Sequence, residues 1–186
     1  MSAVITYENF KGEILISGWE TSNGAREELT LLISQYEPQY LSEIMGIEFY
    51  ELFTAGIANE EERFLKLLTG GKFYENSTTA VKALLFRGLS SDTYWSQPIA
   101  DYVYYWYCRL NDSQMGESGE MAGTPNNAKR VSASMKAVQA WNRSVVLANQ
   151  LQIILAYGVD ENGVRIYPEF EMESAKTLKP INLYGI

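Results

Sequence analysis

The most aromatic stretch of this chain is Tyr102-Val103-Tyr104-Tyr105-Trp106-Tyr107, in which five of the six residues carry an aromatic ring. Around it, apolar residues recur at the spacing i, i+3, i+4, i+7 and i+11, which is typical of one face of a helix. These residues are Ile99, Tyr102, Val103, Trp106 and Leu110. Pro98 suits the first turn of such a helix, because a residue there needs no backbone N–H donor. The pattern predicts an aromatic helix over 98–111.

This helix carries apolar side chains on more than one face, because Tyr104, Tyr105, Tyr107 and Cys108 fall outside the buried row. Two interpretations follow. In the first, the helix is central and its own chain surrounds it, with tyrosine hydroxyls reaching water or a carbonyl. In the second, part of this surface contacts another subunit, since Tyr and Trp are enriched in the cores of protein interfaces.

The length and the cysteine content fit a single domain that folds without disulfide bonds. A chain of 186 residues buries about 70% of the surface that its unfolded form exposes. The one cysteine, Cys108, excludes an internal disulfide. The first twenty residues lack a basic segment followed by an apolar one, and no run of about 18 apolar residues occurs. We therefore expect neither export nor a membrane span, and a protein that is cytosolic or assembled in the cytosol.

Charge and chemistry point away from catalysis. The 15 basic and 23 acidic residues give a net charge of −8, which opposes a grip on a phosphate backbone. The same charge suits either plain solubility or a channel wall along which DNA slides. Histidine, the commonest general base and metal ligand, is absent. Gly70-Gly71-Lys72 lacks the earlier glycine and the following hydroxyl of a phosphate loop. We expect no catalytic, metal or cofactor site.

Caps and breakers predict four short helices before the aromatic one. Pro38 is expected to separate the first helix, which ends near Glu37, from the second. Gly46 and Gly56 are expected to end the second and third helices, and the fourth is expected to begin near Asn59 and to stop at Gly70 and Gly71. A last and longest helix is expected from Ser132 or Ser134 to Tyr157, with Met135, Val138, Trp141, Val145 and Ala148 on one buried row.

The remaining segments are less regular. Residues 1–24 form an N-terminal arm whose apolar run, Ile14-Leu15-Ile16, fits a strand, and 72–92 fit either a hairpin or another helix. Residues 114–127 predict a long loop anchored by Met115 and Met121. Residues 159–186 predict a small hairpin and an apolar tail, which docks either on its own domain or on a neighbour.

These patterns together predict a mainly α fold. It consists of a compact bundle of five or six helices over 25–158, with a possible small β-hairpin and extended N- and C-terminal arms.

One segment carries a resemblance to a known family. Residues 40–53 read Tyr-Leu-Ser-Glu-Ile-Met-Gly-Ile-Glu-Phe-Tyr-Glu-Leu-Phe. This order resembles the early helical signature of tailed-phage head-tail connector (head-completion adaptor) proteins, in which a Tyr-Leu start, a Leu-Gly type break and a Tyr-containing helix follow one another. Other segments resemble the versions carried by Bacteroides-type phages and prophages: Leu68-Thr69-Gly70-Gly71-Lys72-Phe73-Tyr74, Tyr107-Cys108-Arg109-Leu110, a glycine-bearing loop, and Ala140-Trp141-Asn142. The similar positions span about 25 to 157, and the N-terminal arm and C-terminal extension are longer than in small connectors.

The resemblance implies a structural virion protein and no enzyme. About a dozen copies would form a ring beneath the portal protein, extend the DNA channel and present a platform to the next neck or tail protein. DNA would pass through without specific binding, and no membrane or cofactor would be involved. The implied place is the virion neck, with assembly in the cytoplasm of the bacterial host.

Candidate subunit contacts are Tyr104, Tyr105, Tyr107, Met115, Met121, Ile181, Leu183, Tyr184 and Ile186. Two other classes of function are considered. An aromatic-lined binding module for a peptide or small apolar ligand predicts a closed pocket near Trp106 and Trp141. A carboxylate enzyme would use an acidic pair such as Glu169 and Glu171, although these lie in a charged segment where solvated side chains are expected.

Overall fold

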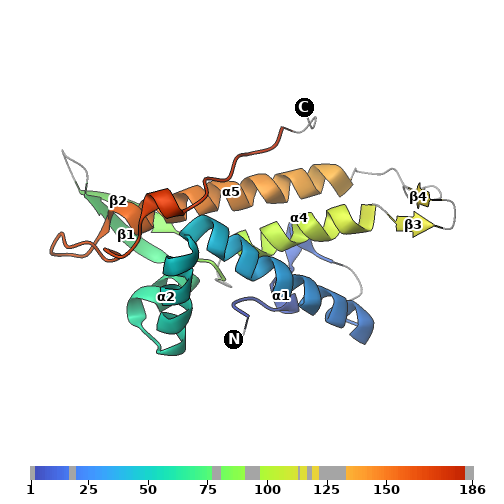
Figure 1. The fold of residues 1–186 in the computed structure, drawn as a ribbon, viewed down its shortest axis with the longest axis horizontal. Coiled ribbons are helices and arrows are strands. Elements are labelled where there is room, and N and C mark those ends of the chain that lie inside the picture. Colours follow the sequence, from blue (N-terminus) through green and yellow to red (C-terminus); the bar gives the residue numbers. More distant parts are fainter. Residues whose placement is uncertain are drawn as a thin grey trace.

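A computed structural model describes residues 3–16, 20–76, 81–90, 97–112, 114–116, 119–121 and 133–182. Within these residues five α-helices form most of the fold, and a small antiparallel sheet joins them (Figure 1). The helices are α1 (Asn23–Met45), α2 (Ile47–Ala58), α3 (Glu62–Thr69), α4 (Pro98–Asp112) and α5 (Ala133–Tyr157). The predicted mainly α fold with a small β element is confirmed.

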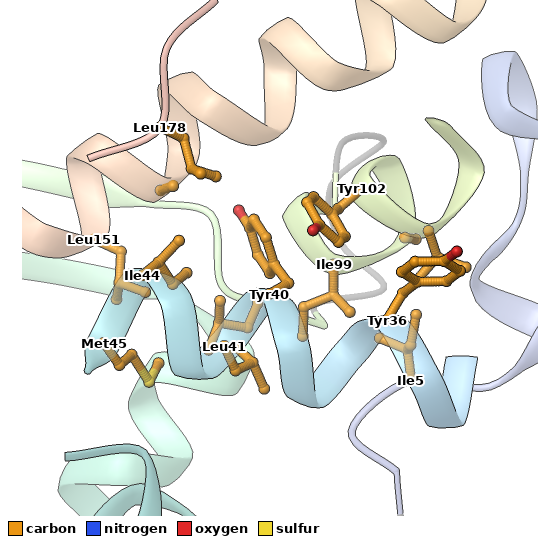
Figure 2. Close-up of a cluster of buried hydrophobic side chains, with 14 of the residues drawn as sticks. Ile5, Tyr36, Tyr40, Leu41, Ile44, Met45, Ile99, Tyr102, Leu151 and Leu178 are labelled. Carbon is orange, nitrogen blue, oxygen red and sulfur yellow. The ribbon is translucent and has the colours of Figure 1, made fainter. Parts of the chain in front are cut away.

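The centre of the fold is the antiparallel pair of α4 and α5, which α1 covers on one side (Figure 1). Small residues on α5, Ala140, Ser144 and Ala148, are almost completely buried and allow close approach. The hydroxyl of Tyr40 on α1 donates a hydrogen bond of 3.0 Å to the backbone carbonyl of Ser144. Figure 2 shows that the N-terminal arm, α1, α4, α5 and the C-terminal tail all supply side chains to this core.

Helix α1 runs through Pro38, so the prediction of two helices separated at this residue was wrong. Proline lacks the N–H that would bond to the carbonyl of Ser34. Tertiary contacts outweigh that loss, because Tyr36, Tyr40 and Leu41 on both sides of the proline are buried in the core. The helix ends where the sequence predicts, at Gly46, whose positive φ of 77° favours glycine.

The expected boundaries between α2 and α3 were also wrong. Gly56 lies inside α2, and Asn59 follows the last residue of that helix instead of starting the next. Helix α3 begins at Glu62 and ends at Thr69, followed by Gly70, as the glycine pair predicted. A side chain at position 56 would collide with the ring of Phe64, so this glycine serves close helix packing instead of helix termination.

The ambiguous region 72–92 contains a hairpin. Strands β1 (Gly71–Asn76) and β2 (Val81–Phe86) pair with Phe73 opposite Leu84, and β5 (Gly158–Val159) pairs with the other edge of β1. Phe73 and Phe86 point into the core, whereas Leu85 is exposed on the opposite face, as the period of two in a strand requires. The predicted C-terminal hairpin is present in reduced form, since Val159 bridges to Arg165.

The predicted long loop is partly a hairpin. Strand β3 (Gln114–Gly116) pairs with β4 (Gly119–Met121). The rest of the predicted loop lies outside the described residues.

The N-terminal arm belongs to the core. Ile5, Phe10 and Ile14 are almost completely buried, and residues Gly12–Ile14 form a 3-10 turn, so the strand expected there is absent from this described segment. The carboxylate of Glu37 on α1 accepts hydrogen bonds from the backbone N–H groups of Val4, at 2.7 Å, and of Ile5, at 3.0 Å. A buried carboxylate therefore fastens the arm to α1.

We expect this fastening to make stability depend on pH. Burial raises the pKa of Glu37 above its ordinary value, and the two backbone hydrogen bonds offset the rise only in part. Because the folded pKa exceeds the unfolded one, the contribution of Glu37 to stability is full below the unfolded pKa and declines as pH rises through the folded pKa. Urea unfolding at pH 5 and pH 7 should show wild type gaining stability at pH 5 relative to Glu37→Gln. A difference that is independent of pH, or of the opposite sign, contradicts this expectation.

Candidate assembly surface

The aromatic helix α4 is surrounded mainly by rings from its own chain. Trp106 stacks on Tyr36 with 5.1 Å between ring centroids, and Tyr105 lies 4.8 Å from Trp141. Tyr104 and Tyr105 are only 8% and 7% exposed, which removes them from the candidate subunit contacts because the monomer already covers them. Tyr107 is half-buried and keeps some accessible surface. The first interpretation of the aromatic stretch, a central helix, describes most of it.

Two residues that were expected in buried rows lie on the surface instead. Leu110 near the end of α4 and Met135 near the start of α5 are about half exposed. Both belong to helix ends next to the β3–β4 hairpin (Figure 1).

Burial raises the pKa of Tyr102 to about 12 and also raises that of Tyr104, so both phenols stay protonated at neutral pH.

The C-terminal tail docks on its own domain as far as Ile181. The indole N–H of Trp141 donates to the carbonyl of Lys179 at 2.9 Å. The side-chain amide of Asn142 donates to the carbonyl of Ile181 and accepts from its N–H, at 2.9 and 2.8 Å. Closer to the sheet, the amide of Gln152 bridges the carbonyls of Ile44 and Lys176. Side-chain amides of α5 thus hold the tail, and Ile181 itself is half-buried.

Asn142→Ala should release this end of the tail. The substitution removes both hydrogen bonds to Ile181, and we expect a loss of about 1 kcal/mol in the free energy of unfolding. Hydrogen exchange at the Ile181 amide should become faster, while exchange at the Lys176 amide, which bonds to the carbonyl of Glu43 at 2.7 Å, should not change. Unchanged exchange at Ile181 would show that Asn142 does not hold the tail.

Two further candidate contacts belong to the β3–β4 hairpin. Met115 lies in β3 and Met121 in β4, and the two strands pair. Leu183, Tyr184 and Ile186 lie outside the described residues. The candidates from α4, from this hairpin and from the tail therefore do not form one described site.

A different surface collects exposed apolar and basic groups. Between β2 and the outer face of α5 lies a hollow of about 640 Å³. Its lining consists of Leu85, Arg87, Gln139, Asn142, Arg143, Val146, Leu147 and Gln150. Val146 is 64% exposed and Leu85 is 55% exposed. We call this surface the α5 groove. Among the described residues, the lining of the groove contains neither a carboxylate nor an aromatic ring.

The floor of the α5 groove is held by polar contacts. The guanidinium of Arg143 donates to the carboxylate of Asp101 on α4, with a shortest distance of 2.8 Å, and to Glu13 of the N-terminal arm at 2.6 Å. Asp101 is almost completely buried. The amide of Gln150 donates to the backbone carbonyl of Leu85 at 2.7 Å and ties α5 to β2. The groove is therefore a fixed feature between packed elements.

Helix α2 presents a second unpartnered surface. Its outward residues are spaced at i, i+1, i+4, i+5 and i+8, which is one helical face. They are Ile47, Glu48, Glu51, Leu52 and Ala55, and all are exposed. Ile47 is 69% and Leu52 44% exposed. We call this surface the α2 ridge.

Neither the groove nor the ridge was predicted from the sequence, although two signals were present. Helix α5 has no acidic residue in 25 positions, in a chain of net charge −8. In α2 the apolar residues fall on two sides, with Phe49 and Phe53 inward and Ile47 and Leu52 outward. A second apolar side on a helix indicates a second contact.

The described residues contain no group of three or more His, Cys, Asp or Glu side chains that could hold a metal ion. Partial burial raises the pKa of Glu169, but hydrogen bonds and the charge of Arg63, 2.9 Å away, outweigh this and hold it below its ordinary value. Such an ion-paired carboxylate is a poor proton donor at neutral pH. The rings of Trp106 and Trp141 contact other rings, so no observation favours the aromatic-lined pocket.

No helix in the described part of the chain has both the length and the apolar character needed to cross a membrane. We compared the chain with protein-family models, with curated proteins and with solved structures, and no match was found. The fold defines the class of protein as a mainly helical domain, with exposed apolar side chains on the outer faces of α2 and α5.

Proposed function

We propose that this protein is a structural ring component of a phage virion, an adaptor between the portal and the next neck or tail protein. The observation that carries the proposal is a folded monomer with a complete core and large apolar side chains left on the outer faces of two helices, α2 and α5. Apolar surface that is grouped and rimmed by charge is typical of protein contact sites. The order of helical segments resembles that of the connector family, and this resemblance is the reason for placing the contact in a virion neck.

The charge of the chain fits the role of a channel component. A net charge of −8 repels the DNA backbone, so DNA could slide past a ring of such subunits without being held. In the proposed assembly about a dozen copies surround the DNA channel. The portal lies on one side of the ring and the next neck or tail protein on the other.

The proposal is tested by mass measurement of the full chain, alone and co-expressed with a portal protein from the same phage or prophage. Native mass spectrometry and electron microscopy should show a ring on the portal, and a 30-base-pair duplex should not be retained at physiological salt. A chain that joins neither portal nor neck under these conditions contradicts the proposal. A monomer in the absence of the portal does not, because the portal could be the template for the ring.

A further inference from the structure

The α5 groove and the α2 ridge are complementary surfaces of the same chain. The groove offers apolar Val146 and Leu85 beside the cations Arg87 and Arg143. The ridge offers apolar Ile47 and Leu52 beside two carboxylates, Glu48 and Glu51. We propose that the α2 ridge of one copy docks in the α5 groove of the next copy. This inference rests on the proposed function only in requiring that copies of the chain assemble.

The spacing of the groups supports such a contact. Residues four apart on a helix are about 6 Å apart along its axis. On the ridge, Ile47 and Glu51 have this separation, and Glu48 and Leu52 repeat it. On the groove, Val146 and Gln150 are four apart, with Arg143 one turn before Val146. An apolar and acidic helix face can thus lie along the apolar side of the groove, with a carboxylate opposite the guanidinium of Arg87.

The two arginines of the groove differ in how they can contribute to binding an acidic partner. Arg143 already bonds to Asp101 and Glu13, and its role is mainly to hold the floor of the groove. Arg87 is exposed on the rim, where β2 has just ended. We therefore expect Arg87 to set the charge preference of the groove for an acidic partner, and Val146 with Leu85 to supply the apolar contact.

The positions of the two surfaces define the type of assembly. Helix α5 lies along one side of the domain and α2 on the other, with α1 between them (Figure 1). A contact between two different surfaces is heterologous, so each copy keeps one free groove and one free ridge. Such contacts continue from copy to copy and close into a ring when the rotation between neighbours permits. A two-fold dimer would instead use the same surface twice.

Two charged substitutions test the contact in the full-length protein by sedimentation velocity over a range of concentrations. Val146→Asp places an anion in the groove, and Leu52→Asp adds one to the centre of the ridge. Each should weaken self-association about tenfold or more. Val164→Asp and Leu31→Asp are matched controls, because these exposed apolar residues, at 61% and 67%, belong to neither surface. Thermal unfolding of all four variants checks that each is folded.

Mixing the variants separates a heterologous contact from a two-fold one. The Val146→Asp protein keeps an intact ridge and the Leu52→Asp protein an intact groove. An equimolar mixture should form a dimer of the two variants and nothing larger. A groove-to-groove dimer would survive Leu52→Asp and be lost with Val146→Asp alone, and that result overturns the proposal.

Cysteine cross-linking at high protein concentration tests whether the ridge of one copy contacts the groove of another, even if association is weak. In a Cys108→Ala background, Val146→Cys and Leu52→Cys proteins should form a mixed disulfide on oxidation, because Cβ atoms must approach within about 4 Å. The control pair Val164→Cys with Leu52→Cys should give at least tenfold less product. Equal yields overturn the inference, whether or not the protein joins a portal. A specific cross-link in a chain that never joins a portal or neck sustains the inference and defeats the proposed function.

Discussion

Phe64→Ala is expected to lower the free energy of unfolding by about 3 to 5 kcal/mol. Phe64 on α3 is almost completely buried. Its ring meets Phe49 and Phe53 of α2 edge to face, with 6.0 Å between centroids in each pair, and lies 6.1 Å from Tyr167 of the C-terminal segment. Removing it leaves a cavity where α2, α3 and the C-terminal segment meet.

The cost should appear as a lower urea midpoint and a decrease of about 10 °C in the melting temperature. Gly56 provides an internal check, because a Cβ at this position would occupy the place of the Phe64 ring. Gly56→Ala should be strongly destabilising in wild type and much less so in the Phe64→Ala background. Tyr74→Ala, on the outer face of the sheet, should cost less than about 1 kcal/mol. Additive effects of Gly56→Ala and Phe64→Ala would show that the two positions do not contact.

Arg143→Met is expected to cost about 3 to 5 kcal/mol, because it leaves the buried carboxylate of Asp101 without its cation. Asp101 is 1% exposed, and the shortest distance to Arg143 is 2.8 Å. The methionine keeps much of the apolar stem of arginine, so the loss comes mainly from the removed guanidinium charge. The contact also joins α4 to α5 at the centre of the fold, where relaxation is limited.

Replacing both partners separates charge from packing. The double variant Asp101→Leu with Arg143→Met should recover most of the lost stability in urea unfolding, since no buried charge remains. Glu13→Gln is the control for the outer ion pair: this side chain is largely exposed, and the substitution should change stability by less than about 1 kcal/mol. A double variant as unstable as Arg143→Met would show that the arginine acts through packing.

Local signals in the sequence predicted the principal helices well. The spacing of Ile99, Tyr102 and Val103 predicted the position of α4. The absence of proline and glycine between residue 133 and Gly158 predicted the length of α5. These signals succeed because a long helix repeats its burial pattern over many turns. The ends at Gly46 and Gly70 were correct because each requires a positive φ.

Local signals failed where a distant contact outweighed them. Pro38 is normally a boundary, but buried neighbours in α1 keep the helix continuous. Gly56 has the residue type of a helix end, and its actual role depends on a ring eight positions later. The hairpin of β1 and β2 could not be distinguished from a helix, because its apolar runs are too short for their spacing to favour either structure. Only the pairing of the two strands decides which residues face the core.

The sequence by itself determined a helical, acidic, histidine-free chain with an aromatic helix at its centre. Only the tertiary structure decided which apolar residues remain outside. Tyr104 and Tyr105 are buried within the chain, and Tyr105 lies against Trp141 of α5, whereas Val146 and Ile47 are covered by no described part of the chain. Composition fixes how much apolar surface a chain has, but which part stays exposed depends on how elements distant in sequence pack together.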